Sequence, residues 1–135
     1  MWTVVAALIQ SEGKLLVCQR RHGDTFGLMW EFPGGKCKPD ETLEAALARE
    51  LLEELGAPAR IGPELYRTRH KYAEMAESIE LVFFAASIDP RDARNNVFEQ
   101  ILWCARESLR DLDFLPADRE LIEMIALGTL RLPAE

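Results

Sequence analysis

"EFPGGKCKPDETLEAALARELLEELGA", residues 31–57, joins a glycine-rich loop to a segment crowded with acidic and basic side chains. Residues 42–55 have the composition of a helix, which Asp40 or Thr42 can cap at its start and Gly56 can end. Charged residues at a helix end often form no more than a solvated surface. The alternative is that these carboxylates act together on a ligand, and the helical geometry helps to decide between the two.

A helical wheel places the glutamates of this segment beside its apolar residues. With about 100° per residue and Glu50 at zero, Leu47 lies at about 60° and Ala46 at about −40°. By the same rule Glu53 falls at about −60° and Glu54 at about 40°. A solvated charge run would lie opposite the apolar stripe. The pattern therefore favours a helix face that leaves the core and lines a wet cleft.

The spacing of the glutamates suits a hard cation. Cβ atoms at i and i+4 are about 5–6 Å apart in a helix, so Glu50 and Glu54 can converge on one ion, with Glu53 near enough for a second ion or a water. Magnesium prefers a few carboxylates together with phosphate oxygens and waters. Arg49 can orient a carboxylate or contact phosphate, and the Gly34–Gly35 pair lets the backbone approach closely.

Composition and charge narrow the function classes. The chain has 135 residues, 48% of them hydrophobic and 29% charged, which predicts a single domain over residues 1–135. A net charge of −7 argues against a nucleic-acid polymer as partner, and a nucleotide would need a cation to offset repulsion. The apolar runs are too short to span a bilayer, so we expect no membrane partner. The widely spaced Cys18, Cys37 and Cys104 suit a reducing cytoplasm.

The rest of the chain predicts a sheet flanked by helices. We expect a helical turn over residues 106–112 and a final helix over 118–127. Strands are expected at residues 3–10, 15–21, 30–32, 64–72, 78–88 and 97–105. Strands in the middle, with helices both early and late, indicate the α+β class and a mixed sheet in an α-β-α sandwich.

The spacing within residues 35–57 resembles the Nudix box at every fixed position. The matching residues, separated by five, seven, one and one others, are Gly35, Glu41, Arg49-Glu50-Leu51, Glu53-Glu54 and Gly56-Ala57. The segments "VCQRR", "WEFPGGK" and "FLPADRELI" extend the likeness to MutT-type members of the Nudix family, which are nucleoside triphosphate pyrophosphohydrolases. The resemblance implies an α-β-α sandwich, Mg²⁺ or Mn²⁺ as cofactor, and a nucleoside monophosphate and pyrophosphate as products.

The resemblance also implies roles for individual residues. The metal ligands by position are Gly34 through its carbonyl, Glu50, Glu53 and Glu54. Either Glu50 or Glu53 could take a proton from the attacking water. Arg49 belongs to the same catalytic group by position, although the resemblance favours a role for Arg49 and Glu41 in holding the loop and the helix together over a role in the chemistry. A further acidic ligand of MutT falls near Val97 here, and Glu99 is the nearest carboxylate that could replace it.

Substrate contacts are implied in three places. The residues that resemble the nucleotide-contacting segments are Arg21, Glu31, Phe32, Pro33, Gly34, Gly35 and Lys36. Asp118 occupies the position of the base-reading Asn of MutT, and it departs from that pattern because a carboxylate only accepts hydrogen bonds. Asp118 could instead cap the final helix. Both roles stay open at this point.

Three functions are compatible with this pattern. The first is Mg²⁺-dependent hydrolysis of a modified nucleoside triphosphate such as 8-oxo-dGTP, by a monomer or weak homodimer. The second keeps the chemistry but changes the substrate to CTP, a modified dCTP, ADP-ribose or a dinucleoside polyphosphate. The third is an inactive nucleotide-binding module, against which the intact set of charged residues argues.

Overall fold

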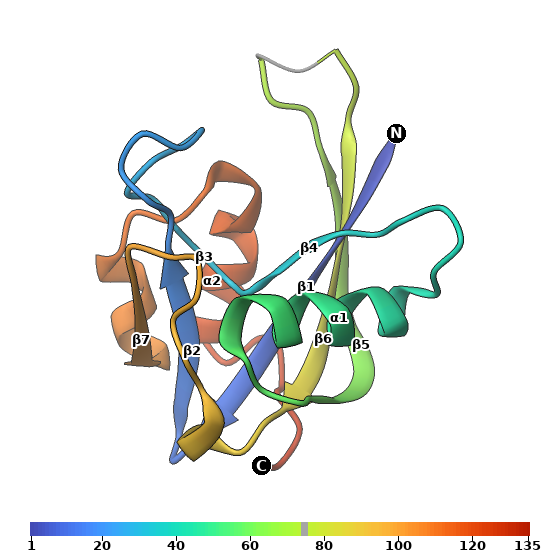
Figure 1. The fold of residues 1–135 in the computed structure, drawn as a ribbon. Coiled ribbons are helices and arrows are strands. Elements are labelled where there is room, and N and C mark those ends of the chain that lie inside the picture. Colours follow the sequence, from blue (N-terminus) through green and yellow to red (C-terminus); the bar gives the residue numbers. More distant parts are fainter. Residues whose placement is uncertain (74–75) are drawn as a thin grey trace.

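In the computed structural model, which describes residues 1–73 and 76–135, seven strands form one sheet between helical layers (Figure 1). The strands are β1 Trp2–Ser11, β2 Lys14–Gln19, β3 Trp30–Glu31, β4 Gly34–Lys36, β5 Arg60–His70, β6 Ile79–Ser87 and β7 Gln100–Ala105. The helices are α1 Leu43–Leu55, α2 Arg119–Ala126 and the 3₁₀ helices η1 Pro90–Asp92, η2 Arg106–Asp111 and η3 Pro116–Asp118. In the described part of the chain, no helix has the length and apolarity needed to cross a membrane.

The sheet is mixed, as the sequence predicts. Its order is β3-β2-β1-β6-β5, with β4 also paired to β1 and β7 to β2. The pair β1–β6 is parallel, and the other pairs are antiparallel. The middle of β1, residues 5–9, is buried because both faces of the sheet are covered. One apolar core lies under α1 and the other under α2, which confirms the α-β-α sandwich.

Helix α1 begins and ends where local chemistry dictates. The Oγ1 of Thr42 accepts a hydrogen bond from the Ala45 N–H at 3.1 Å, so Thr42 and not Asp40 is the cap. Gly56 ends the helix in the left-handed region, with φ 66°, and donates its N–H to the Leu52 carbonyl. The buried face of the helix consists of Ala46, Leu47, Leu51 and Leu55.

Several predicted strand boundaries are wrong. β5 starts at Arg60 instead of residue 64 and ends at His70, and β7 starts at Gln100 instead of residue 97. β4 has no predicted counterpart, because glycines are depleted in strands and this segment reads as a loop. The pairing of Gly34 and Gly35 with β1 brings the backbones together closely. A Cβ on Gly34, at φ 154°, would collide with the Val5 carbonyl oxygen.

Candidate active site

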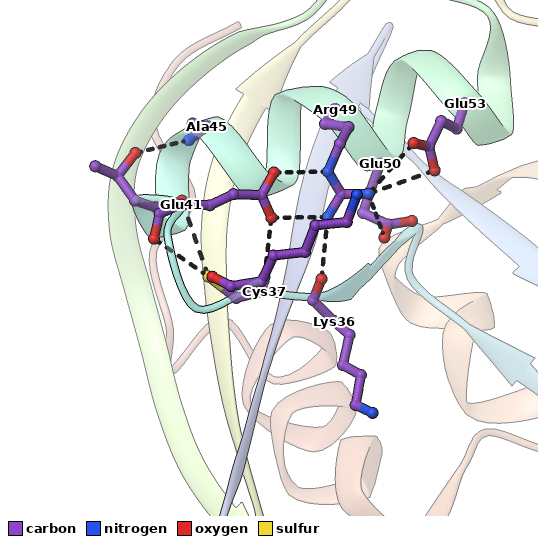
Figure 2. A network of polar contacts seen from close by, with 9 residues as sticks. Lys36, Cys37, Glu41, Ala45, Arg49, Glu50 and Glu53 are labelled. Carbon is purple, nitrogen blue, oxygen red and sulfur yellow. Dashed lines mark hydrogen bonds and ion pairs between the residues drawn. The ribbon is translucent and has the colours of Figure 1, made fainter.

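A single guanidinium joins α1 to the loop and to β4 (Figure 2). The Nε and Nη2 of Arg49 donate to both oxygens of Glu41, at 2.6 and 2.9 Å. Its Nη1 donates to Glu50 at 3.0 Å and to Glu53 at 3.3 Å, and Nη2 also reaches the Lys36 carbonyl at 3.1 Å. These hydrogen bonds lower the pKa of Glu41 to about 2. Through these contacts Arg49 and Glu41 hold the loop against the helix, which is the structural role that the sequence suggested for them.

Glu50 lies against the glycine strand. Its side chain is 15% exposed, and a Cβ built on Gly35 would stand 2.5 Å from the Glu50 carboxyl carbon. Burial raises the pKa of Glu50, while the hydrogen bond from Arg49 opposes that rise. The absence of a side chain at position 35 thus leaves the space that the Glu50 carboxylate fills.

Glu54 and Glu53 lie in contrasting environments. Glu54 is partly buried and accepts a hydrogen bond from the Gly34 N–H at 3.0 Å. Burial raises its pKa to about 8, and the charges of Glu50 and Glu31 add to the rise. The Glu53 side chain is 57% exposed and pairs with Arg49. The three neighbouring glutamates are therefore chemically distinct groups.

A cavity of about 410 Å³ extends from Glu54 to Asp118. Three carboxylates contribute to its lining: Glu31, Glu54 and Asp118. Gly34, Gly35 and Lys36 of β4 also line it, together with Arg20, several aliphatic residues and aromatic residues. The aromatic lining residues are Trp2, Phe26, Phe32, Tyr72 and Phe83. Acidic groups and flat aromatic surfaces in one cavity suit a ligand that is itself flat and carries N–H donors.

Asp118 lines this cavity and does not cap the helix that follows it. It stands at the N-cap position of α2 but makes no capping hydrogen bond with its side chain, so the capping role is wrong. The residue is 3% exposed. Burial raises the pKa of its carboxyl to about 8, with a smaller contribution from the charge of Glu31.

Six of the predicted site residues lie outside the cavity lining: Arg49, Glu50 and Glu53 of α1, and also Arg21, Pro33 and Glu99. Arg21 is exposed. The Pro33 carbonyl accepts a hydrogen bond from the Ala7 N–H of β1 at 2.9 Å. A carboxylate oxygen of Glu99 accepts a hydrogen bond from the His22 N–H at 3.2 Å, so this contact supports the loop that follows β2. Arg20, and not Arg21, lines the cavity. The Nη1 of Arg20 donates to both carboxylate oxygens of Glu31, at 3.2 Å.

The missed residues had unequal signals in the sequence. Arg20 is one position from the predicted Arg21, because β2 ends at Gln19 and not at residue 21 as predicted. Trp2, Phe26 and Tyr72 come from separate parts of the chain, and only the folded sheet and its loops bring them to one cavity. No local pattern identifies them.

The donor set at α1 and β4 fits a hard divalent cation. Within residues 1–73 and 76–135, no three His, Cys, Asp or Glu side chains are grouped closely enough to hold a metal as they stand. However, Glu50 and Glu54 both have a raised pKa beside the glycine strand, and carboxylate and carbonyl oxygens are the preferred ligands of Mg²⁺ and Mn²⁺. A cation there would relieve the carboxylate repulsion. The ligands named from the sequence remain a prediction.

The site thus joins a glycine strand, a helix that carries several glutamates and a cavity that suits a flat ligand. The family model described as NUDIX domain matches residues 1–125. The chain belongs to the Nudix hydrolase family, whose members act on nucleotides and generally use divalent metal ions.

Relatives and solved structures agree with this assignment. The chain is 37% identical to CTP pyrophosphohydrolase of Escherichia coli K12, in a match that covers 100% of this chain and 98% of that protein. It is 32% identical to the 8-oxo-dGTP diphosphatase of Haemophilus influenzae, over 90% of this chain and 89% of the relative. The solution structure of the E. coli ORF135 protein superimposes with a TM-score of 0.84 at 32% identity, covering 100% and 95% of the two chains.

Proposed function

We propose that this protein hydrolyses a nucleoside triphosphate to the monophosphate and pyrophosphate. The observation that carries the proposal is one cavity that Glu54 of the Nudix helix shares with the β4 glycines and with Asp118. In this arrangement the base lies against the aromatic walls near Asp118. The phosphates extend toward α1, where the glutamates are concentrated.

The chain's own residues would hold a divalent cation and prepare the water. Glu50, Glu53, Glu54 and the Gly34 carbonyl are the proposed ligands of Mg²⁺ or Mn²⁺. When bound, the cation offsets phosphate charge and lowers the pKa of a water ligand. Arg49 positions Glu50 and Glu53 through its hydrogen bonds. Of the two candidate bases, Glu53 has the greater access to solvent for exchanging a proton.

Asp118 and Glu31 are the proposed readers of the base. With its pKa near 8, Asp118 carries a proton at neutral pH and can donate as well as accept, as the Asn of MutT does. The acceptor oxygens suit the N1–H and amino group of guanine, the N7–H of an 8-oxopurine, and the amino group of cytosine. The names of the relatives support 8-oxo-dGTP and CTP equally. Both therefore stand as candidate substrates, and ADP-ribose and dinucleoside polyphosphates remain alternatives.

A nucleotide panel tests the proposal. The panel contains 8-oxo-dGTP, dGTP, CTP, dCTP, ADP-ribose and a dinucleoside polyphosphate, each with Mg²⁺ and with a chelator. We expect metal-dependent release of a nucleoside monophosphate and pyrophosphate, measured by ion-exchange chromatography. Orthophosphate and a nucleoside diphosphate as primary products would contradict the proposed bond, and turnover of nothing in the panel would favour an inactive binding module.

The setting of the enzyme is part of the same proposal. Three free cysteines, two of them buried, support a reducing cytoplasm. We also propose a monomer or weak homodimer that binds neither a nucleic-acid polymer nor a membrane. Sedimentation at several protein concentrations, with and without duplex DNA, would measure the first two of these properties.

A further inference from the structure

Two residues, Trp2 and Lys36, stand at the border between two cavities. Both line the 410 Å³ cavity that contains Glu54 and Asp118. Both also line a second cavity, of about 660 Å³, which includes Glu50 and Arg49. Because the proposed substrate places its base in the first cavity and its phosphates near α1, its phosphate chain would pass this border.

The two side chains are in direct contact. The Nζ of Lys36 lies 3.4 Å from the centroid of the Trp2 ring. The sheet register explains the meeting, because Lys36 pairs with Val4, and Trp2 precedes Val4 by two residues on the same side of β1. The Lys36 carbonyl accepts from Arg49, while its side chain points away from that network (Figure 2). Arg49 thus holds the backbone of β4 at Lys36, and the Trp2 ring holds the Lys36 ammonium.

The ring holds this charge without neutralising it. The ion pairs formed among residues 1–73 and 76–135 do not include Lys36, although the chain has a net charge of −7. An aromatic face attracts an ammonium through its quadrupole, so the full positive charge remains available to an anion. A lysine fixed in this way also loses less rotamer freedom when that anion binds.

We propose that Trp2 is a positioning residue that holds the Lys36 ammonium in place to receive a phosphate group. The nature of the anion, a nucleotide phosphate, rests on the proposed function. The positioning itself does not, since it follows from the contact, the register and the shared border. Trp2 acts through Lys36 and makes no contact of its own with the reacting atoms.

Pyrophosphate binding in the presence of Mg²⁺, measured by calorimetry, tests the proposal without any turnover. We expect Trp2→Leu to weaken binding about two- to fivefold, the effect of losing one exposed cation–π contact. Trp2→Phe keeps an aromatic face and should recover part of the affinity. Lys36→Met should weaken binding at least as much, and adding Trp2→Leu to it should have no further effect. Trp2 is 44% exposed, so thermal unfolding should show that these variants fold.

A second measurement separates this proposal from the proposed function. In the NMR spectrum of the intact protein, the Trp2 ring should shift the Lys36 Cε protons upfield, and Trp2→Leu should remove that shift. Coupled effects on pyrophosphate binding with no hydrolysis of any nucleotide would overturn the proposed function alone. Wild-type affinity in Trp2→Leu, additive losses in the double variant, or a wild-type protein that binds no pyrophosphate would overturn the positioning role.

Discussion

The carboxylates beside Arg49 and those in the 410 Å³ cavity have similar chemistry but opposite electrostatics. Around Arg49, three carboxylates share one guanidinium, and the pKa of Glu41 falls to about 2. In the cavity, burial raises the pKa of both Glu54 and Asp118 to about 8. A compensated cluster builds structure, whereas buried acids store repulsion that a cation or a ligand can relieve. The contrast separates Glu41, which holds the loop to the helix, from Glu54 and Asp118 in the cavity, while Glu50 and Glu53 belong to the Arg49 cluster and are also proposed metal ligands.

The substitution Glu54→Gln should give the largest effect on activity. It removes the carboxylate charge but keeps the size of the side chain, so we expect kcat/KM to fall by at least about a hundredfold. Wild-type-like turnover of this variant under limiting Mg²⁺ would contradict the metal assignment.

The same substitution should behave differently in unfolding experiments. Because the pKa of Glu54 is about 8 in the folded protein and ordinarily 4.5, the folded state binds a proton that the unfolded state releases between these values. Metal-free wild-type protein therefore loses stability as the pH rises through this window. Gln has no such proton, so the Tm of the variant relative to wild type should increase from pH 5 to pH 9.

Two alanine substitutions in β4 separate structural from functional glycine. Gly34→Ala meets the Val5 backbone at φ 154°, and we expect it to destabilise the fold by about 2 kcal/mol or more. Gly35→Ala meets only the mobile end of Glu50, so the fold should be retained while Glu50 is displaced. We expect a roughly tenfold or greater loss of kcat in the second variant. Denaturant unfolding and kinetics on both proteins check the contrast, and equal stability losses would contradict it.

Breaking the compensated cluster should lower stability in a pH-dependent way. In Arg49→Met we expect Tm to fall by roughly 5 °C at pH 7. The pKa of Glu41 is depressed in the folded state, so its contribution is present above pH 4.5 and disappears as the pH falls through about 2. The difference in Tm between the two proteins should therefore shrink in acid. Glu41→Gln is the matched control, and a loss of Tm that is independent of pH would point to packing alone.

Local signals in the sequence predicted the helix well and the cavity poorly. Thr42, Gly56 and the stripe shared by Leu47 and Glu54 reflect helix chemistry that acts over a few residues, so α1 could be placed within one residue. β4 could not be predicted, since its glycines are dictated by the approach of β1 and not by strand propensity. Long-range pairing also decides which side chains share a cavity.

The carboxylates show the same division between local and long-range information. Spacing alone placed Glu50, Glu53 and Glu54 on one side of the helix. It could not reveal that they would differ in burial, because the partner surfaces come from β4 and from the loops. Asp118 is the extreme case, since its position before the final helix left a capping role open, and the structure buries the residue without a capping hydrogen bond.

The smallest effect is expected for Asp118→Asn, and its value lies in how it changes with pH. Below pH 7 the wild-type carboxyl is protonated and can donate and accept as Asn does, so the ranking of substrates should agree within about threefold. Above pH 8.5 the wild-type group only accepts. Relative kcat/KM for 8-oxo-dGTP and CTP should then diverge between the two proteins by up to about tenfold.

The pH dependence of Tm tests the protonation of Asp118 independently of activity. The raised pKa means that wild-type stability declines between about pH 4 and pH 8, where the unfolded chain has already released the proton. Asp118→Asn should remove this decline and gain in Tm toward pH 9. The control is Asp113→Asn, which makes the same chemical change at a side chain that is 74% exposed and should alter neither property. A purely structural Asp118 would show the gain in Tm with a substrate ranking that stays the same at every pH, and that result would remove it from the base-reading role.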